Sequence, residues 1–464
     1  MARFCLIPTI STYYDTLLSA RARACWTLAF CGLAATLAGC HSGTPPHGAA
    51  KTPAGSLSYR LELADALKDG IPIDPQALQE PEPPVEQNAA PFYAQLAALL
   101  GSRPLPSNIT RLTSHTIPSD RQFDLARADL APYSDILEQV RMVAERPKCV
   151  FVADWSDPNR VEVIKPGVVR SISRLLRARS LVLAHQDKPL DAVKWQALGF
   201  QIARHIADQN WGYSDAYFVE SSATGGLVEI LLIAGDEPEV AGAVRAAIES
   251  SWEPYSLARM LKTRAGMNAV ILENLRAAGP ASLLPLIARS SVTPASIDPQ
   301  HWDSFIDENG SQLLRHSQTI AAIADMPYVR AHPAFRTAET SVDADNNPNH
   351  LLLGLMEEKH DDMLEQRTSA IARAQVTRAA AAVLEWKVRH RAYPTSLSQA
   401  ISPAPADPFS DKPLSYRREG WGFVVYSVGK SGKHAGGRIS QAARKGEAVF
   451  RYPLPPSLKG PIKE

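Results

Sequence analysis

The chain has 464 residues, of which 45% are hydrophobic and 21% are charged. This composition is typical of globular proteins, and the length corresponds to two or three domains. The 49 basic and 48 acidic side chains nearly cancel. That balance excludes a net field that would attract nucleic acid over a long range, so any charge-driven contact must be local and no nucleic-acid partner is expected.

The amino terminus has the pattern of a secretory signal. Arg21 and Arg23 precede an apolar run over residues 25–35, which is followed by the sequence LAGC at residues 37–40. A basic region, a short apolar region and a small-residue cleavage site form a signal peptide, and this apolar region is too short to span a bilayer. A plain secretory signal and a buried helix are the alternatives.

The sequence LAGC resembles the bacterial lipobox, in which the cysteine receives a diacylglycerol and the peptide before it is removed. The resemblance implies that residues 1–39 are a signal peptide and that Cys40 is the lipidated first residue. His41 stands where an aspartate would be the retention signal, which implies the outer membrane, facing the periplasm. An acyl anchor holds a protein on a membrane surface without spanning the membrane.

With the leader removed and Cys40 acylated, Cys149 is the remaining cysteine, so no intramolecular disulfide is expected. Its apolar neighbours predict a buried, unreactive thiol.

Residues 40–88 are rich in Pro, Gly, Ser and Ala. This composition predicts a flexible tether between the lipid and the folded body. Within it, the sequence SLSYRLELADALK at residues 56–68 is compatible with a short helix or a strand.

Residues 89–340 are predicted to form an α-helical domain. Helical periodicity covers 90–100, 125–144, 169–185, 190–207, 216–233, 238–250, 254–277 and 311–324. The short turn at residues 186–189 predicts that the helices on either side of it are antiparallel. This pair resembles a tetratricopeptide-like helical hairpin, but no second copy keeps a fixed period, which favours a hairpin bundle over a repeat array.

Residues 341–464 are predicted to form a long helix, from about residue 350 to residue 390, followed by a small β module. Tyr393-Pro394 ends the helix, because proline restricts the residue before it and cannot continue the hydrogen bonding. The predicted fold class is therefore mainly α: a helical-hairpin bundle with a long late helix and a small C-terminal antiparallel β module.

Two short alternating segments, around Leu414 and Tyr416 and around Phe423 and Val425, predict half-buried strands joined by a turn at residues 418–420. This stretch resembles the globular domain of the type II secretion major pseudopilins. The matching positions are Tyr393-Pro394, Leu397, Asp407-Pro408-Phe409, Pro413, Tyr416, Gly422-Phe423 and Tyr426-Ser427-Val428-Gly429.

The chain departs from the pseudopilin pattern in two ways. The helix before the module is internal and charged, so the protein is not expected to be a pilin subunit. The family's calcium-binding loop is acidic, whereas residues 420–446 contain no Asp or Glu. Calcium takes oxygen ligands, often carboxylates, so calcium is not expected at this loop.

The loop SVGKSGKHAGG at residues 427–437 is not a P-loop. The pattern GxxxxGK[ST] fails in both possible registers, because Val424 or Ser427 stands where the first glycine is needed. What remains is a basic set that is either a solvated surface or a contact for anionic lipid head groups or another envelope polymer. Its members are Lys430, Lys433, His434, Arg438, Arg444 and Lys445.

Few other residues point to chemistry. Glu357 and His360 are three residues apart, which is the spacing of half a metal–carboxylate site, but a surface salt-bridging role is favoured. His185 and His205 belong to one hairpin and could approach each other. The sequence therefore predicts no catalytic residue, no metal and no cofactor.

The predicted function is that of a lipid-anchored cell-envelope protein that acts as a non-catalytic scaffold or protein-interaction module. Its partners are the membrane, through the lipid on Cys40, and an unidentified envelope protein. The alternative is a periplasmic enzyme or small-ligand binder that uses a cavity between the helices, with His185, His205, Glu357 and His360 as its candidate residues.

Overall fold

The computed structural model describes residues 55–112, 118–156, 161, 164–208, 213–283, 299–343, 351–356, 360–432, 436–437 and 448–453. Within these residues the chain is mainly helical, with a three-stranded antiparallel sheet near its C-terminus. The predicted fold class is therefore confirmed. The predicted signal peptide and Cys40 lie outside the described residues.

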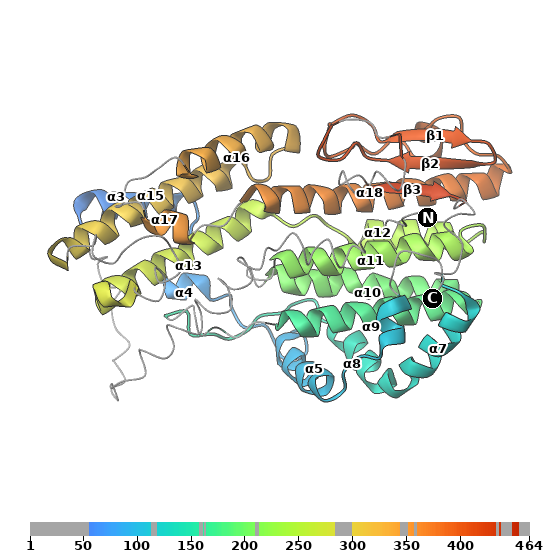
Figure 1. The fold of residues 1–464 in the computed structure, drawn as a ribbon, viewed down its shortest axis with the longest axis horizontal. Helices are drawn as coiled ribbons and strands as arrows, with labels where there is room; N and C mark the ends of the chain where they lie inside the picture. Colours follow the sequence, from blue (N-terminus) through green and yellow to red (C-terminus); the bar gives the residue numbers. More distant parts are fainter. Residues whose placement is uncertain are drawn as a thin grey trace, which may run out of the picture.

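The molecule is elongated, and its helices gather at two ends (Figure 1). The first end contains α5 (Ala90–Ser102), α6 (Ser107–Leu112), α7 (Asp120–Leu130), α8 (Ser134–Ala144), α9 (Pro166–His185), α10 (Pro189–Asp208), α11 (Tyr213–Ala234) and α12 (Val240–Ser251). The second end contains α3 (Leu57–Lys68), α4 (Pro75–Leu78), α13 (Leu257–Ala278), α15 (Trp302–Ile323), α16 (Tyr328–Asp343) and α17 (Leu351–Met356).

The long helix α18 (His360–His390) runs from the second end along the first (Figure 1). After the short α19 (Leu397–Ala400), the sheet of β1 (Ser415–Glu419), β2 (Gly422–Tyr426) and β3 (Val449–Tyr452) lies over the later half of α18. Beneath α18 lie α11 and α12, then α10 and α9, and then α5 to α8. The first end is thus a stack of helical layers with the sheet on top.

The largest core cluster of buried side chains runs from Leu183 to Phe450. It includes residues of α11, α12, α18 and β2, so both sides of the boundary predicted between residues 340 and 341 share one core. Small side chains on α18 allow this close packing: Ala372, Ala374, Ala379, Ala380 and Ala381 are all buried.

The strands pair in the order β1-β2-β3, with Arg418 opposite Phe423 and Tyr416 opposite Val425. The predicted turn is therefore shifted, because Arg418 and Glu419 belong to β1 and the turn falls on Gly420 and Trp421. Gly420 has a φ of +56°, which glycine adopts without steric cost.

Strand β2 is buried along its whole length, whereas alternation predicted a half-buried strand. Phe423 and Val425 belong to the core cluster that includes α18. On the other face, Gly437 lies against Val424 and Tyr426 so closely that a Cβ on this glycine would come within 2.9 Å of their side chains. Both faces of β2 are therefore covered.

Most predicted helices are present, with three differences. The helix predicted over residues 125–144 is divided into α7 and α8 by a 3-10 turn that contains Pro132. Helix α15 begins at Trp302, earlier than predicted. Helix α16 was not predicted, and it contains Pro333.

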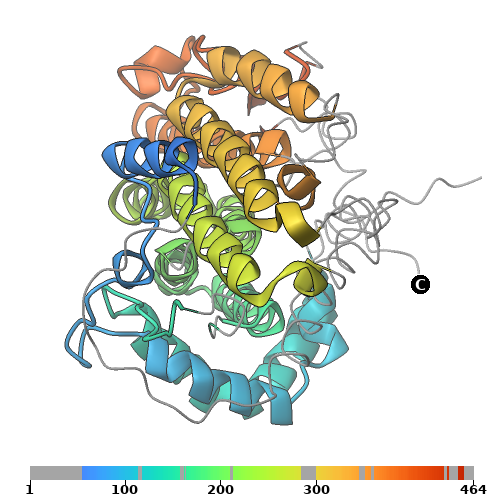
Figure 2. The ribbon, with the colours of Figure 1, turned by 90° about the vertical axis from the view of Figure 1, so that its left-hand side faces the viewer.

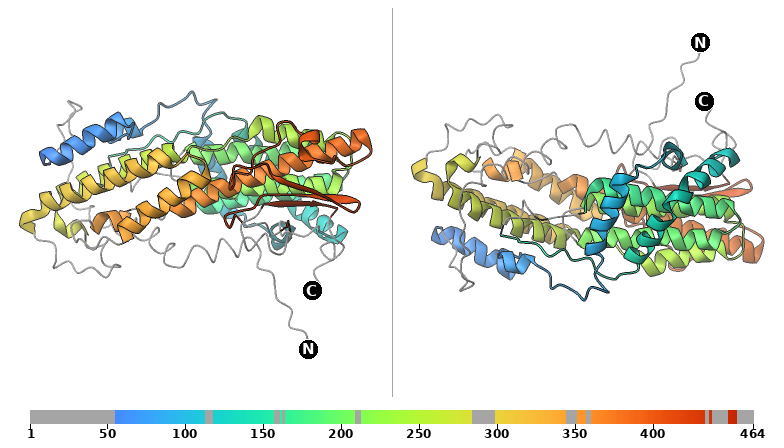
Figure 3. Two further views of the ribbon diagram at one scale, coloured as in Figure 1. Left: turned by 90° about the horizontal axis from the view of Figure 1, so that it is seen from above. Right: turned by 90° about the horizontal axis from the view of Figure 1, so that it is seen from below.

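The predicted tether at residues 40–88 is corrected from Ser56 onward. Helix α3 buries Tyr59, Leu63 and Ala66 against residues of α13 and α15. It lies along the outside of the second end, beside α15 (Figures 2 and 3). The Pro- and Ser-rich composition of residues 40–88 predicted a tether, although residues 56–68 were compatible with a short helix. The stability of α3 comes from packing rather than from its own helix propensity.

Among the described residues, one helix has the length and hydropathy of a membrane span, over Ser214–Ala234. This segment is α11, which packs against α9, α10, α12 and α18. The core helix of a layered bundle passes the same test, so the finding is weak evidence for a span.

Candidate functional site

Of the predicted basic set, the structure describes Lys430. Its Nζ lies 2.8 Å from Oε2 of Glu365 on α18, so this cation pairs within the molecule. Lys433, His434, Arg438, Arg444 and Lys445 lie outside the described residues, as does Cys40. The predicted lipid or polymer contact therefore stays a prediction.

His205 is fully buried and has hydrogen-bond partners on both ring nitrogens. Its Nδ1 lies 3.0 Å from the hydroxyl of Tyr93, and its Nε2 lies 2.7 Å from the carbonyl oxygen of Arg146. Because a carbonyl only accepts, Nε2 carries the proton and Nδ1 accepts from the tyrosine. Burial lowers the pKa of His205 to about 4. His205 is thus a neutral core residue with no free nitrogen for a ligand.

The structure does not bring His185 and His205 together. His185 ends α9 and stacks on Phe123, with ring centroids 4.1 Å apart. His205 lies near the far end of α10, which at 1.5 Å per residue is about 24 Å along the helix from the hairpin turn. Glu357 lies outside the described residues, and of His360 the structure describes the backbone, as the first residue of α18. His185 and His205 therefore do not share one site.

The thiol of Cys149 is buried, as predicted, and burial raises its pKa.

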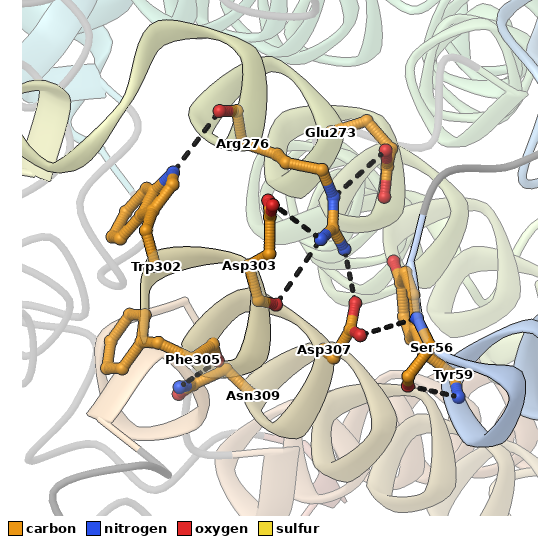
Figure 4. Close-up of polar contacts among 9 residues, drawn as sticks. All are labelled: Ser56, Tyr59, Glu273, Arg276, Trp302, Asp303, Phe305, Asp307 and Asn309. Atoms are coloured by element: carbon orange, nitrogen blue, oxygen red, sulfur yellow. Dashed lines mark hydrogen bonds and ion pairs between the residues drawn. The ribbon is translucent and has the colours of Figure 1, made fainter. Parts of the chain in front are cut away.

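A polar network with a buried ion pair at its centre lies where the N-terminal segment docks on the second end (Figure 4). Arg276 on α13 and Asp307 on α15 form an ion pair of 2.6 Å, and both side chains are almost fully buried. The other carboxylate oxygen of Asp307 accepts a hydrogen bond of 2.6 Å from the backbone N–H of Ser56. Ser56 in turn caps α3, since its hydroxyl accepts from the N–H of Tyr59. One buried carboxylate therefore joins α3, α13 and α15.

The guanidinium of Arg276 makes further contacts in the same network. It lies 3.4 Å from carboxylate oxygens of Glu273 and of Asp303, and 5.5 Å from the centre of the Tyr59 ring. The carbonyl of Arg276 accepts a hydrogen bond of 3.2 Å from the indole of Trp302 (Figure 4). A buried charge is costly unless it is paired and hydrogen-bonded. Here the two terminal nitrogens of the guanidinium donate to Asp303 and Asp307.

Two glycines permit the close approach of the N-terminal segment. A Cβ on Gly310 of α15 would lie 2.5 Å from Cε2 of Tyr59, and a Cβ on Gly266 of α13 would lie 2.3 Å from the carbonyl oxygen of Pro72. Nearer the surface, Arg315 pairs with Glu62 at 2.8 Å. These contacts fix the segment over more than 15 residues of its length.

We call the contact of residues 55–80 with α13 and α15 the N-terminal seam. Two clefts lie along this seam. One cleft, of about 400 Å³, lies between the segment and the start of α13 and is lined in part by Glu80, Arg259 and Lys262. The other, of about 260 Å³, lies beside Ser56 and Asp307. Sequence reasoning missed the seam. The one signal was Ser56 as an N-cap before the apolar positions Tyr59 and Leu63.

Among the described residues, one group of side chains has the composition and spacing of a metal site. It consists of His332, Asp361 and Glu365, on α16 and α18. Sequence reasoning missed this group as well, because its members come from two helices.

Comparison with models of known protein families, with characterised proteins and with solved structures finds no match to this chain.

Proposed function

We propose that the protein is a lipid-anchored cell-envelope protein and that it acts as a non-catalytic scaffold for another envelope protein. The observation that carries this proposal is the docking of α3. The buried Arg276–Asp307 pair fixes Ser56 to the body. The proposed lipid on Cys40 is therefore separated from the folded body by a short segment.

The reach of that segment limits where the body lies. Sixteen residue steps separate Cys40 from Ser56. A fully extended chain spans at most about 3.5 Å per residue, so the start of α3 stays within ~55 Å of the lipid. The second end of the molecule would thus be the membrane-proximal end.

The outward face of α3 suits such a position. Leu57 and Leu61 are one turn apart and are 68% and 58% exposed, and Ala64 continues the same face. Arg60 is also exposed beside them. Exposed apolar side chains beside a cation can contact a lipid surface and its anionic head groups.

The opposite end carries a candidate partner contact. Trp421 is 86% exposed at the β1–β2 turn, which lies at the end of the molecule away from α3 (Figure 1). Tryptophan is enriched among the residues that dominate binding energy at protein interfaces. We therefore assign Trp421 as a contact to the partner.

The test is in-cell crosslinking of the full chain, followed by purification from membranes and mass spectrometry. We expect the wild-type chain in the membrane fraction with a stoichiometric partner, and Cys40→Ala in the soluble fraction. Trp421→Ala should lose the partner while keeping the membrane location. Val152→Ala, which removes another exposed apolar side chain away from the β1–β2 turn, is the control and should keep both.

A soluble wild-type chain would contradict the anchor. A membrane-bound chain with no partner would contradict the scaffold and favour the alternative, a small-ligand binder or enzyme.

A further inference from the structure

The group of His332, Asp361 and Glu365 lies at the junction of α16 and α18. Asp361 and Glu365 are one turn apart in the first turns of α18, so they share a face. His332 lies on α16, and its Nε2 is 3.5 Å from Oδ1 of Asp361. One ligand atom from each residue lies within 4.8 Å of those of the other two.

One oxygen of the Asp361 carboxylate, Oδ1, lacks a hydrogen-bond donor among the described residues. The residue is 9% exposed, and its Oδ1 is buried without a hydrogen-bond partner in the structure. Buried carboxylate oxygens are normally hydrogen-bonded or bound to a cation, so this oxygen, facing His332, indicates a ligand.

The surroundings hold two of the three side chains in position. The ring of Tyr328 stacks on His332 at 4.9 Å and packs edge-on against Phe409. Lys430 binds Oε2 of Glu365 at 2.8 Å and so holds the second side chain.

The charges around the group are mixed. Arg336 lies 3.9 Å from Oδ2 of Asp361, and its side chain is 67% exposed, so it can turn toward solvent. Glu339 accepts the N–H of Asp361 and adds a negative charge beside the two carboxylates.

We propose that His332, Asp361 and Glu365 bind one divalent transition-metal ion of the Zn²⁺ class. Zn²⁺ binds His nitrogens and Asp or Glu oxygens, and open zinc sites combine three protein ligands with a water in the fourth position. The mixed nitrogen and oxygen donors favour Zn²⁺ over Ca²⁺ or Mg²⁺, which prefer oxygen ligands alone. The site is independent of the lipid anchor and of the scaffold function proposed above.

Binding requires a small contraction of the group. Metal–ligand distances of about 2.1 Å place tetrahedral ligand atoms about 3.4 Å apart. The present spacing of up to 4.8 Å must therefore shorten, and rotation of the Glu365 side chain, which is not fully buried, can supply this movement. A bound ion would join α16 to α18 and, through Lys430 and Phe409, to the C-terminal module.

The test is equilibrium dialysis of the tag-free, chelator-treated full chain against Zn²⁺, with metal measured by mass spectrometry. We expect one equivalent of Zn²⁺ per chain. His332→Ala and Glu365→Gln should each weaken binding by more than about tenfold. His185→Ala removes a half-exposed histidine elsewhere and should keep the full equivalent.

Co²⁺ provides a second readout, because a tetrahedral Co²⁺ site absorbs visible light. We expect this absorption in the wild-type chain and its loss in Glu365→Gln, whose circular dichroism should match that of the wild type. A chain that binds no Zn²⁺, or variants that keep the equivalent, would overturn the proposal.

Discussion

Two buried ionisable residues at the first end have pKa values that are shifted in opposite directions. Burial lowers the pKa of His205 to about 4 and raises that of Glu220 to about 7. Glu220 accepts a hydrogen bond from the indole of Trp252, and Arg373 and Arg367 partly offset the effect of its burial. Each residue links folding to pH, in opposite directions.

We expect His205 to make the protein less stable as the pH falls. The folded pKa of about 4 is below the ordinary value of 6.5, so the unfolded chain takes up the proton first. The resulting contribution of His205 to the free energy of unfolding is complete above pH 6.5 and is lost as the pH falls toward 4. It amounts to on the order of 3 kcal/mol at most. We measure the free energy of unfolding in urea at pH 7.5 and pH 4.5. In His205→Gln it should be lower than in the wild type at pH 7.5, and it should fall less between the two pH values.

Glu220 acts in the opposite sense. Its folded pKa of about 7 is above the ordinary 4.5, so stability is lost as the pH rises from 4.5 through 7. Glu220→Gln keeps an oxygen for the indole of Trp252 and removes the buried charge. We expect it to be more stable than the wild type at pH 8, by up to on the order of 3 kcal/mol, and equal at pH 4. An equal difference at both pH values would show that Glu220 does not titrate in this way.

At the scale of elements, Asp407 organises the β module. It is buried, and its carboxylate accepts hydrogen bonds from the hydroxyl of Ser427, the N–H of Val428 and the N–H of Phe409, at 2.7 to 3.0 Å. One side chain thus joins the turn before β1 to the end of β2. The same Asp-Pro-Phe sequence carried part of the pseudopilin resemblance, and here its role is to hold this fold together.

Asp407→Asn should destabilise the module by about 3 kcal/mol. The amide group would present N–H donors where backbone N–H groups now point, which leaves buried groups unpaired. Asp411→Asn, in the adjacent turn, is the matched control and should change stability by less than about 0.5 kcal/mol, since Asn tolerates its positive φ. Hydrogen exchange of the β2 amides measures the loss of stability in each of the two variants. Equal protection in the two variants would contradict this role of Asp407.

Elements with strong local periodicity could be predicted from the sequence. The hairpin of α9 and α10 has apolar residues at helical spacing and a short turn, so both helices and their boundaries were largely correct. Helix α16 was missed because Pro333 lies inside it. For residues 56–68 the sequence left a short helix or a strand open, and it did not predict that this segment docks on the body.

The sites could not be predicted for a different reason. Ser56 and Asp307 are 251 residues apart, and no local pattern records such a contact.

At the scale of the whole molecule, the N-terminal seam is separate from the rest of the core. The cluster around Tyr59 includes side chains of α3, α13 and α15. The two large clusters contain no side chain of α3, although the largest one includes the start of α13, the end of α15 and part of α16. Loss of the seam should therefore release residues 55–80 without unfolding the layers of the first end. The N-terminal segment can then detach from the body by local unfolding, while the rest of the fold stays intact.

Gly310→Val tests this separation. A Cβ at this position would lie 2.5 Å from the ring of Tyr59, so the ring must move and α3 must leave its groove or shift along it. We expect hydrogen exchange of the α3 amides to rise by at least tenfold, while the amides of α9 and α10 keep wild-type protection. Gly101→Val in α5 is the control, because a Cβ there has open space around it. If protection fell together in α3 and α9, the seam and the first end would unfold as one unit, and the short reach from Cys40 would be a property of the whole fold rather than of the Arg276–Asp307 pair.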